Sequence, residues 1–238
     1  MSTIGNWRGP NIVKDGLVLY LDPGSPNSYL NKTSTTIKDI SGNGNNGTLT
    51  NFGSQTIYDP ANGGSIVFDG TNDHILLPYT GNTNNNYTFN IVMKCSNMDS
   101  NNNNRQTLFG LSYNNNFAFR QFTLEIWGNS GVGFRGNGGT IENVDFVYYL
   151  WSTGGDANSI NFYTVTLNST GHSIYVNGVL KNTINQPYTS DFNSVYLGYR
   201  REGNYWNGNF YLFQMYNRVL SSNEILQNFN ATKTRFGL

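Results

Sequence analysis

The sequence predicts an all-β protein, a single antiparallel two-sheet sandwich with one short helix at its C-terminal end. Short apolar runs bounded by Gly, Asn, Asp and Ser recur along most of the 238 residues, which is typical of strands joined by tight turns. Aromatic residues make up 15% of the chain and charged residues 12%, a balance that favours strands over long amphipathic helices. Helical spacing of apolar residues appears at the C-terminal end.

The N-terminal part of the chain predicts four strands. Residues 16–22 form a strand that carries apolar side chains on both faces. A loop rich in glycine and asparagine, within residues 39–50, leads into the second strand. Residues 63–77 then give two strands around Asp69 and Gly70, a dipeptide typical of tight turns.

The middle of the chain predicts further short strands. Residues 87–95 alternate so that Tyr87, Phe89, Ile91 and Met93 share one face of a strand. Other strands are predicted at residues 107–111, 117–127, 131–134, 146–151 and 161–167. Strands at this density, with turn residues between them, favour an antiparallel sandwich over a parallel sheet.

A hairpin is predicted inside the segment SIYVNGVL, residues 173–180. Its turn is Asn177-Gly178, because a two-residue type I′ turn needs positive φ at both central residues and these two residue types tolerate it. Taken alone, the dipeptide is weak support for a hairpin.

The C-terminal segment contains two strands and the helix. Residues 195–199 and 209–216 alternate, and the second strand carries apolar side chains on both faces, so we expect both faces to be covered. Ser221 or Ser222 can cap the helix that follows, with Glu224 in its first turn. Apolar residues then recur at helical spacing at Ile225, Leu226 and Phe229.

The hairpin and the C-terminal strand, followed by Tyr-Asn-Arg-Val-Leu-Ser and a helical turn, occur in this order in a known family. Together with residues 16–22, 39–50 and 63–73, they resemble laminin-G-like, pentraxin-related domains of the concanavalin A-like lectin/glucanase superfamily, of the kind found in tailed-phage structural proteins. The resemblance implies a jelly-roll sandwich over residues 13–238. Residues 1–12 are then an N-terminal arm.

Charge and composition argue against several classes of partner. Lys plus Arg and Asp plus Glu both total 14, and this neutral balance disfavours a nucleic-acid partner or an anionic membrane surface. No apolar run reaches the ~18 residues of a membrane span, and the N-terminus lacks the apolar core of a signal peptide. Cys95 is the only cysteine, which excludes an intrachain disulfide and fits a protein made in a reducing cytosol.

We expect no enzymatic activity. Glycosidases need two close carboxylates, and the E-x-D-x-E run of the family's glucanases is absent; the nearest acids, Glu125, Glu142 and Asp145, do not form it. His74 and His172 are interpreted as surface or turn residues, and no nucleophile elbow is present. A glycoside hydrolase is the least favoured alternative.

We expect no cofactor, with calcium as an open alternative. The resemblance implies a calcium site at one rim, but the pentraxin-type cluster would fall where this chain has two arginines beside Glu202, which would repel a cation. Asp39 and the pair Asp69 and Asp73 remain as weak metal candidates. We favour turn capping for all three, because Asp commonly bonds its own backbone in such loops.

Carbohydrate binding is the function that the resemblance most often implies. Sugars are held by aromatic faces with amide and hydroxyl groups in shallow loops, and the candidates here are Tyr113, Trp151, Glu202 and Tyr205. Trp206, which directly follows Tyr205, is expected in the core instead.

The resemblance therefore predicts a non-enzymatic virion protein of a tailed phage, assembled in the host cytoplasm. It would serve in capsid decoration or in a tail fibre or baseplate, contact other virion proteins and offer a surface for host glycans. We expect a homo-oligomer, a trimer, to which the N-terminal arm contributes. A free lectin or adhesin is the alternative.

Overall fold

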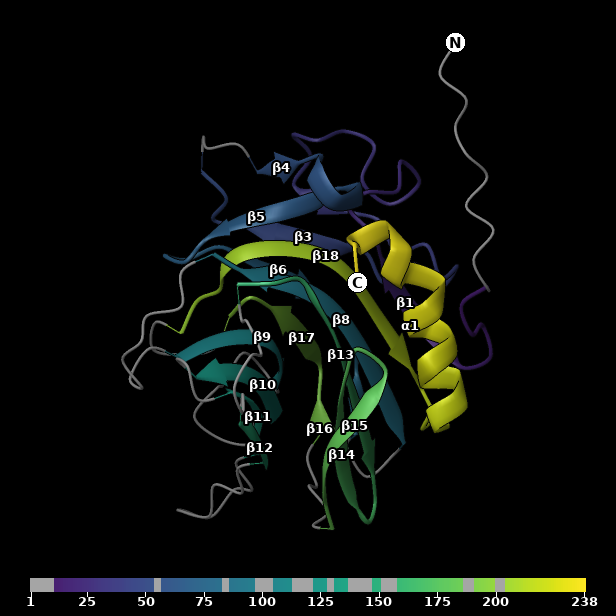
Figure 1. The fold of residues 1–238 in the computed structure, drawn as a ribbon. Helices are drawn as coiled ribbons and strands as arrows, with labels where there is room; N and C mark the ends of the chain where they lie inside the picture. Colours follow the sequence, from purple (N-terminus) through teal and green to yellow (C-terminus); the bar gives the residue numbers. More distant parts are fainter. Residues whose placement is uncertain are drawn as a thin grey trace.

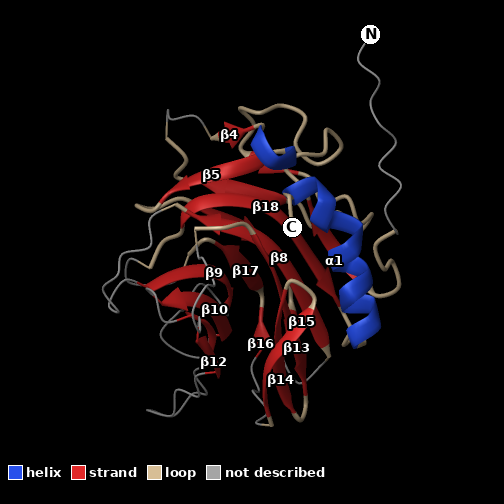
Figure 2. Ribbon diagram, in the orientation of Figure 1, coloured by secondary structure: helices blue, strands red, loops and turns tan. Residues whose placement is uncertain are grey.

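The computed structural model describes residues 11–53, 57–82, 86–96, 105–112, 122–127, 131–136, 147–150, 158–185, 191–199 and 204–238. Two antiparallel sheets face each other, and α1 (Ser222–Phe236) lies across the outer face of one of them (Figures 1 and 2). The predicted fold class, an all-β sandwich with a C-terminal helix, is confirmed. Among the described residues, no helix is both long enough and apolar enough to cross a membrane.

The first sheet, here called sheet A, has the strand order β15-β14-β13-β8-β18-β5-β4, with β1 also paired to β18. Its strands are β1 (Leu17–Leu21), β4 (Tyr58–Asp59), β5 (Ser65–Asp69), β8 (Tyr87–Cys95), β13 (Asn161–Asn168), β14 (Gly171–Val176), β15 (Val179–Ile184) and β18 (Asn207–Tyr216). The long strand β18 lies beside β8 along one edge. Along its other edge, β5 pairs with the first half of β18 and β1 with the second half.

The second sheet, sheet B, has the order β12-β11-β10-β9-β17-β6-β3-β2. Its strands are β2 (Thr36–Ile37), β3 (Gly47–Thr50), β6 (His74–Leu77), β9 (Arg105–Ser112), β10 (Phe122–Trp127), β11 (Gly131–Gly136), β12 (Val147–Leu150) and β17 (Ser194–Leu197). A short ribbon joins β7 (Gly81–Asn82) to β16 (Asp191–Phe192), and a turn of 3-10 helix, η1 (Ala61–Gly63), precedes β5.

The main core lies between the two sheets. The β8 face predicted to be apolar faces this core, where Phe89 meets Phe109 of β9 at 5.0 Å between ring centroids. The opposite faces of β8, β13 and β18 are also buried, because Phe229 and Phe236 of α1 pack against Phe162 and Tyr211, respectively. The prediction that the strand at residues 209–216 is covered on both faces is therefore confirmed.

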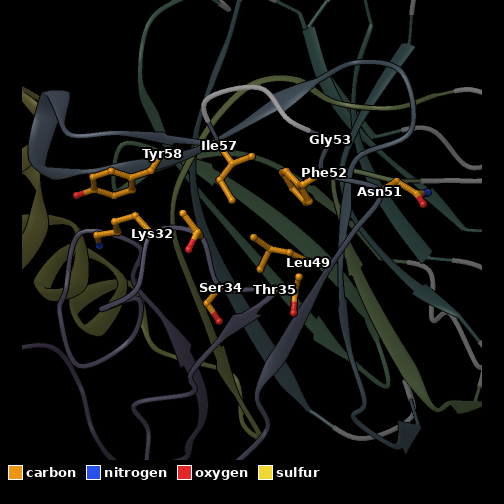
Figure 3. A pocket seen from close by; sticks show the side chains of 10 residues that line it. Lys32, Ser34, Thr35, Leu49, Asn51, Phe52, Gly53, Ile57 and Tyr58 are labelled. Carbon is orange, nitrogen blue, oxygen red and sulfur yellow. The ribbon is translucent and has the colours of Figure 1, made fainter.

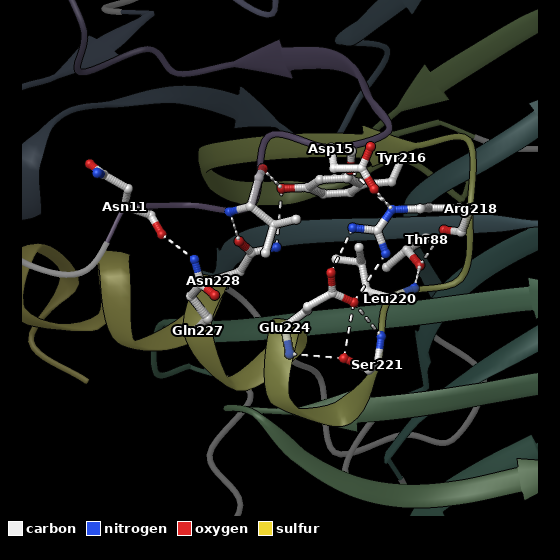
Figure 4. Close-up of polar contacts among 11 residues, drawn as sticks. Asn11, Asp15, Thr88, Tyr216, Arg218, Leu220, Ser221, Glu224, Gln227 and Asn228 are labelled. Carbon is white, nitrogen blue, oxygen red and sulfur yellow. Dashed lines mark hydrogen bonds and ion pairs between the residues drawn. The ribbon is translucent and has the colours of Figure 1, made fainter.

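The helix begins as predicted. Ser221 is its N-cap, and its hydroxyl accepts from the backbone N–H of Glu224 while the Glu224 carboxylate accepts from that of Ser221 at 2.8 Å. Arg218 donates two hydrogen bonds to the same carboxylate, at 2.6 and 3.0 Å (Figure 4). Mainly because of the Arg218 bond, the pKa of Glu224 falls to about 2.

The helix is longer than the sequence suggested, and its buried face is partly polar. Ile225 is buried as expected, whereas Leu226 is 43% exposed. Asn228 and Thr232 face inwards instead, since the Asn228 amide bonds the chain at Val13 and the hydroxyl of Tyr216. The spacing of apolar residues could not predict this buried face of the helix, because two of its residues, Asn228 and Thr232, are polar and form hydrogen bonds.

The turns that the sequence predicted are present in the structure, but one of them connects strands that do not pair with each other. Asn177 and Gly178 have φ of 52° and 78°, as a type I′ hairpin requires, and they connect β14 to β15. Two strands do flank Gly70, but β5 belongs to sheet A and β6 to sheet B, so this turn links the sheets rather than closing a hairpin. Of the predicted N-terminal arm, residues 1–10 lie outside the described residues.

Candidate functional site

Of the four predicted sugar-binding residues, Tyr205 lies within the described part of the chain. Its ring stacks on that of Tyr199, with centroids 4.9 Å apart and planes 20° apart. Tyr199 in turn stacks on His74, at 5.1 Å and 30°. We call these three partly exposed rings the aromatic ladder. Tyr113, Trp151 and Glu202 fall outside the described residues, so the predicted grouping stays a prediction.

The histidine of the ladder, His74, lies in a partly buried position that disfavours its protonation. His74 Nδ1 lies 3.1 Å from the carbonyl oxygen of Asn72, which by itself would favour the protonated ring. Burial dominates and lowers the pKa of His74 below its ordinary 6.5. The imidazole is therefore neutral at pH 7 and stacks as an aromatic ring.

A pocket of about 540 Å³ opens at the side of the sandwich where the edge strands of the two sheets approach each other (Figure 3). Its size falls in the range of roughly 300–1,000 Å³ that small-molecule sites occupy. It is lined by Lys32, Thr33, Ser34, Thr35, Leu49, Asn51, Phe52, Gly53, Ile57 and Tyr58. These residues come from the segment before β2, the end of β3 and the segment entering β4.

One wall of the pocket is apolar. Phe52 and Ile57 point into it towards Leu49, and the ring of Tyr58 extends the wall sideways (Figure 3). Phe52 is held in place by Phe68 of the main core, in an edge-on contact of 5.1 Å between centroids. Phe52 and Tyr58 remain partly exposed, so they offer aromatic surface to a ligand.

Other lining residues supply uncharged polar groups. The Ser34 hydroxyl accepts from the backbone N–H of Thr36 at 3.0 Å, which leaves its own hydrogen to donate. The Asn51 amide nitrogen donates to the carbonyl of Asn72 at 3.2 Å, and its oxygen remains an acceptor. Thr35 is exposed and adds a further hydroxyl. Donors and acceptors are thus both present.

Lys32 is the charged residue of the lining, and its ammonium is already engaged. It donates to the backbone oxygens of Pro23, at 2.8 Å, and of Tyr29. It also lies 4.1 Å from the centre of the Tyr58 ring, a cation–π contact. Burial lowers the pKa of Lys32, and the charge of Asp22 opposes this in part. The side chain therefore fixes the loop and the Tyr58 wall.

Tyr29, which accepts a hydrogen bond from Lys32 through its backbone oxygen, also supports the pocket. The Tyr29 hydroxyl donates to the carbonyl of Ser34 at 2.9 Å, which holds the polar side of the pocket in place. Burial raises the pKa of Tyr29 to about 12, so the hydroxyl keeps its proton at any physiological pH.

A laminin-G model of the concanavalin A-like lectin/glucanases superfamily matches residues 69–226, more than half of the sequence. The chain belongs to this superfamily. The family predicted from the sequence is confirmed, while its phage setting stays a prediction. No curated protein sequence matches the chain significantly.

Solved structures of other proteins share this superfamily fold. Domain 4 of an extracellular arabinanase from Geobacillus stearothermophilus, in complex with arabinotriose, has a TM-score of 0.65 at 17% identity, covering 90% of this chain and 98% of that one. Botulinum neurotoxin type C, whose cell entry depends on interaction with two ganglioside molecules, has a TM-score of 0.65 at 18% identity, with 92% and 52% covered. Trypanosoma rangeli sialidase has a TM-score of 0.62 at 15% identity, with 92% and 33% covered. The chain thus spans about half of the neurotoxin chain and a third of the sialidase, and these likenesses concern the fold alone.

The three metal candidates of this concanavalin A-like domain engage in turn hydrogen bonds. Asp39 accepts from the backbone N–H groups of Tyr20, Ser41 and Asn45, each at 2.9 Å. Asp69 accepts from the N–H of Thr71. These bonds are those expected of loop-capping carboxylates.

The third candidate, Asp73, is buried and accepts from the backbone N–H of Asp69 at 3.0 Å. Over the described ranges, no group of three or more His, Cys, Asp or Glu side chains could hold a metal ion. The calcium alternative draws no support from the geometry of these residues.

Of the residues weighed for catalysis, Glu125 and His172 are not among the residues that line the pocket. Glu125 is fully buried on β10 and accepts from the Thr123 hydroxyl at 2.9 Å, whereas Glu142 and Asp145 lie outside the described residues. His172, interpreted from the sequence as a surface or turn residue, is buried, and its ring meets Phe122 edge-on at 6.0 Å. That interpretation was wrong because β14 is covered at this point.

Two further sequence interpretations are settled. Trp206 is fully buried in the main core, as predicted. Cys95 is buried in the same core, with Sγ 3.4 Å from the Gln106 side-chain oxygen, which agrees with a structural thiol.

The pocket was missed from the sequence. Three segments separated along the chain build it, and two of them enter strands of only two residues, too short to show an alternating pattern. One signal was available: Phe52 is a large aromatic residue within an otherwise polar stretch, TNFGSQT.

Proposed function

We propose that this domain is a non-enzymatic carbohydrate-binding module and that the pocket lined by Phe52, Ile57, Tyr58 and Thr35 is its sugar site. The observation that carries this proposal is the combination, in one pocket, of an apolar and aromatic wall with uncharged hydroxyl and amide groups. Sugars present the same combination, since their C–H faces pack on aromatic rings and their hydroxyls need both donors and acceptors.

The electrostatics favour a neutral sugar. Among the described lining residues none is acidic and Lys32 is the one cation, which already donates to two backbone oxygens. An anionic sugar would have to compete for that ammonium, whereas a neutral sugar needs only the groups of Ser34, Thr35 and Asn51. The structural likeness to an arabinanase domain in complex with arabinotriose supports the choice of neutral glycans as first probes.

The test is a glycan array followed by calorimetry on whatever binds, with arabinotriose included. Thr35→Val keeps the shape of the side chain and removes its hydroxyl, and should weaken binding about fivefold, the effect of roughly 1 kcal/mol. Phe52→Ala should weaken it about tenfold by removing the stacking surface. Leu226→Ala, which truncates an exposed apolar side chain on α1, is the matched control and should bind like wild type.

The same samples test whether the domain is an enzyme. We expect no release of new reducing ends from a glycan that binds, because binding here needs no carboxylate pair. Hydrolysis that survives purification and is lost in Glu125→Gln would instead favour a glycoside hydrolase. If neither Thr35→Val nor Phe52→Ala changed the affinity for a glycan that binds, the pocket would not be the sugar site.

We further propose that the protein works in a tailed-phage virion, as a head decoration or a tail fibre or baseplate component that offers its sugar site to the host. The support is the resemblance of the sequence blocks described above. Cryo-EM of purified particles is the test: density on the capsid lattice indicates decoration, density at a fibre tip or baseplate rim indicates host recognition, and particles without the protein favour a free lectin or adhesin.

Assembly as a homo-oligomer, a trimer, belongs to the same proposal. Gln227 on α1 donates to the backbone oxygen of Asn11, which places this residue of the arm beside the exposed side of the helix. Light scattering should report a trimer for the full chain and dissociation to smaller species when residues 1–11 are deleted. A full-length monomer would contradict this proposal and leave the sugar site unaffected.

A further inference from the structure

The pocket and the aromatic ladder lie on the same rim of the sandwich. Neighbouring strands of sheet B are antiparallel, so the end of β3, the start of β6 and the end of β17 all reach one rim. The register shows this directly, because Thr50 pairs with His74 and Leu197 pairs with Ile75. Asn51 and Phe52 of the pocket follow Thr50, and Tyr199 of the ladder follows Leu197.

A single backbone oxygen links the two features. The carbonyl of Asn72 accepts from the amide of Asn51, a pocket residue, at 3.2 Å. The same oxygen lies 3.1 Å from Nδ1 of His74, the first ring of the ladder. The polar end of the pocket and the near end of the ladder are therefore immediate neighbours, and both are fixed by the turn between β5 and β6.

The ladder leads away from the pocket in steps of one ring. From His74 the stack continues through Tyr199 to Tyr205, with centroid spacings of 5.1 and 4.9 Å. Tyr205 stacks one face on Tyr199 and stays partly exposed, so part of its ring is available at the rim. Tyr196 supports the stack from the side, 5.7 Å from Tyr199.

We propose that the pocket and the aromatic ladder form one continuous site for a linear neutral oligosaccharide, with one sugar in the pocket and the following sugars along the rim to Tyr205. This inference rests on the proposed function and narrows it to chain-like glycans of several sugars. The row offers, in order, the Phe52 wall, the Asn51 amide, the edges of the stacked His74 and Tyr199 rings and the terminal ring of Tyr205. This succession suits a repeating ligand rather than a single terminal sugar.

The test is the dependence of affinity on chain length. The probes are neutral linear series from monosaccharide to hexasaccharide, namely arabino-, xylo-, malto- and cello-oligosaccharides, measured by calorimetry. For the series that binds, affinity should continue to rise beyond the disaccharide. Tyr205→Ala should lower affinity for the hexasaccharide about tenfold and leave the shortest binding member unchanged, whereas Tyr205→Phe should retain the wild-type values.

The outcomes separate this inference from the proposed function. Affinity that stops rising at one or two sugars, while still falling in Thr35→Val, would overturn the continuous site and leave the pocket as a sugar site. A rise with length that Tyr205→Ala does not reduce would also overturn it. If no series binds, the neutral-glycan function fails and this inference fails with it.

Discussion

The backbone N–H of Val13 donates a buried hydrogen bond of 2.8 Å to the side-chain oxygen of Asn228, 215 residues further along the chain (Figure 4). The nitrogen of the same amide donates to the Tyr216 hydroxyl at 3.1 Å, and that hydroxyl donates back to the Val13 carbonyl at 3.0 Å. Three residues thus close a ring of hydrogen bonds that joins the segment before β1, the central strand β18 and the helix.

Asn228→Ala should therefore lower the free energy of unfolding by about 2 kcal/mol, because it leaves a buried backbone N–H without its acceptor. Urea denaturation measures this. Asn223→Ala, an exposed asparagine on the same helix, is the control and should change stability by less than about 0.5 kcal/mol. Equal changes in the two variants would contradict a special contribution of the Asn228 hydrogen bonds.

The Glu224 carboxylate should make stability depend on pH. Its pKa is lowered to about 2 from 4.5, so the charged form stabilises the fold above pH 4.5 and that contribution disappears as pH falls towards 2. Since the pair with Arg218 is partly exposed, we expect wild type to lose about 1 kcal/mol more than Glu224→Gln between pH 5 and pH 2. Parallel pH profiles for the two proteins would contradict this role.

The end of the helix is anchored by charge. Arg235 donates two hydrogen bonds of 2.6 Å to the buried carboxylate of Asp22 and one to the carbonyl of Gly63. Arg235→Met should destabilise the protein by about 3 kcal/mol, because the buried carboxylate loses its partner. Lys233→Met on the same turn is the matched control and should unfold within a few degrees of wild type in a thermal melt.

Two glycines with positive φ differ in the space around their backbone. Gly208 and Gly42 both have positive φ, 146° and 97°, but a Cβ on Gly208 would come within 2.0 Å of the Lys94 carbonyl oxygen, whereas one on Gly42 would meet open space. We expect Gly208→Ala to cost about 3 kcal/mol and Gly42→Ala only about 1 kcal/mol. Denaturation midpoints that fall equally would show that backbone strain, not crowding, sets both costs.

The features that the sequence predicted are local ones. The Asn177-Gly178 turn, the capping by Ser221 and the two apolar faces of β18 each depend on residues adjacent in the chain, so their patterns survive in a single sequence. Sheet membership depends on distant partners. Nothing in residues 63–77 distinguishes a hairpin from the crossing between sheets that the structure shows.

The candidate site was predicted only at one end. Tyr205 stood out as an aromatic residue in a loop, and it does lie on the rim. The opposite end could not be anticipated, because Thr35 and Phe52 face one pocket only after β2 and β4 have become the edges of two different sheets. The burial of His172 was missed for the same reason, since its cover comes from Phe122 on another sheet.

The position of β18 has a consequence for how the chain is made. Among the described strands β18 comes last in the chain, and β8, β5 and β1 all pair with it, so none of them can complete its ladder until it has been made. Until the helix arrives, the outer face of β8 has no cover, and loop closure between distant segments makes the final step slow. We therefore expect the incomplete domain to be prone to aggregation until these last elements have been made.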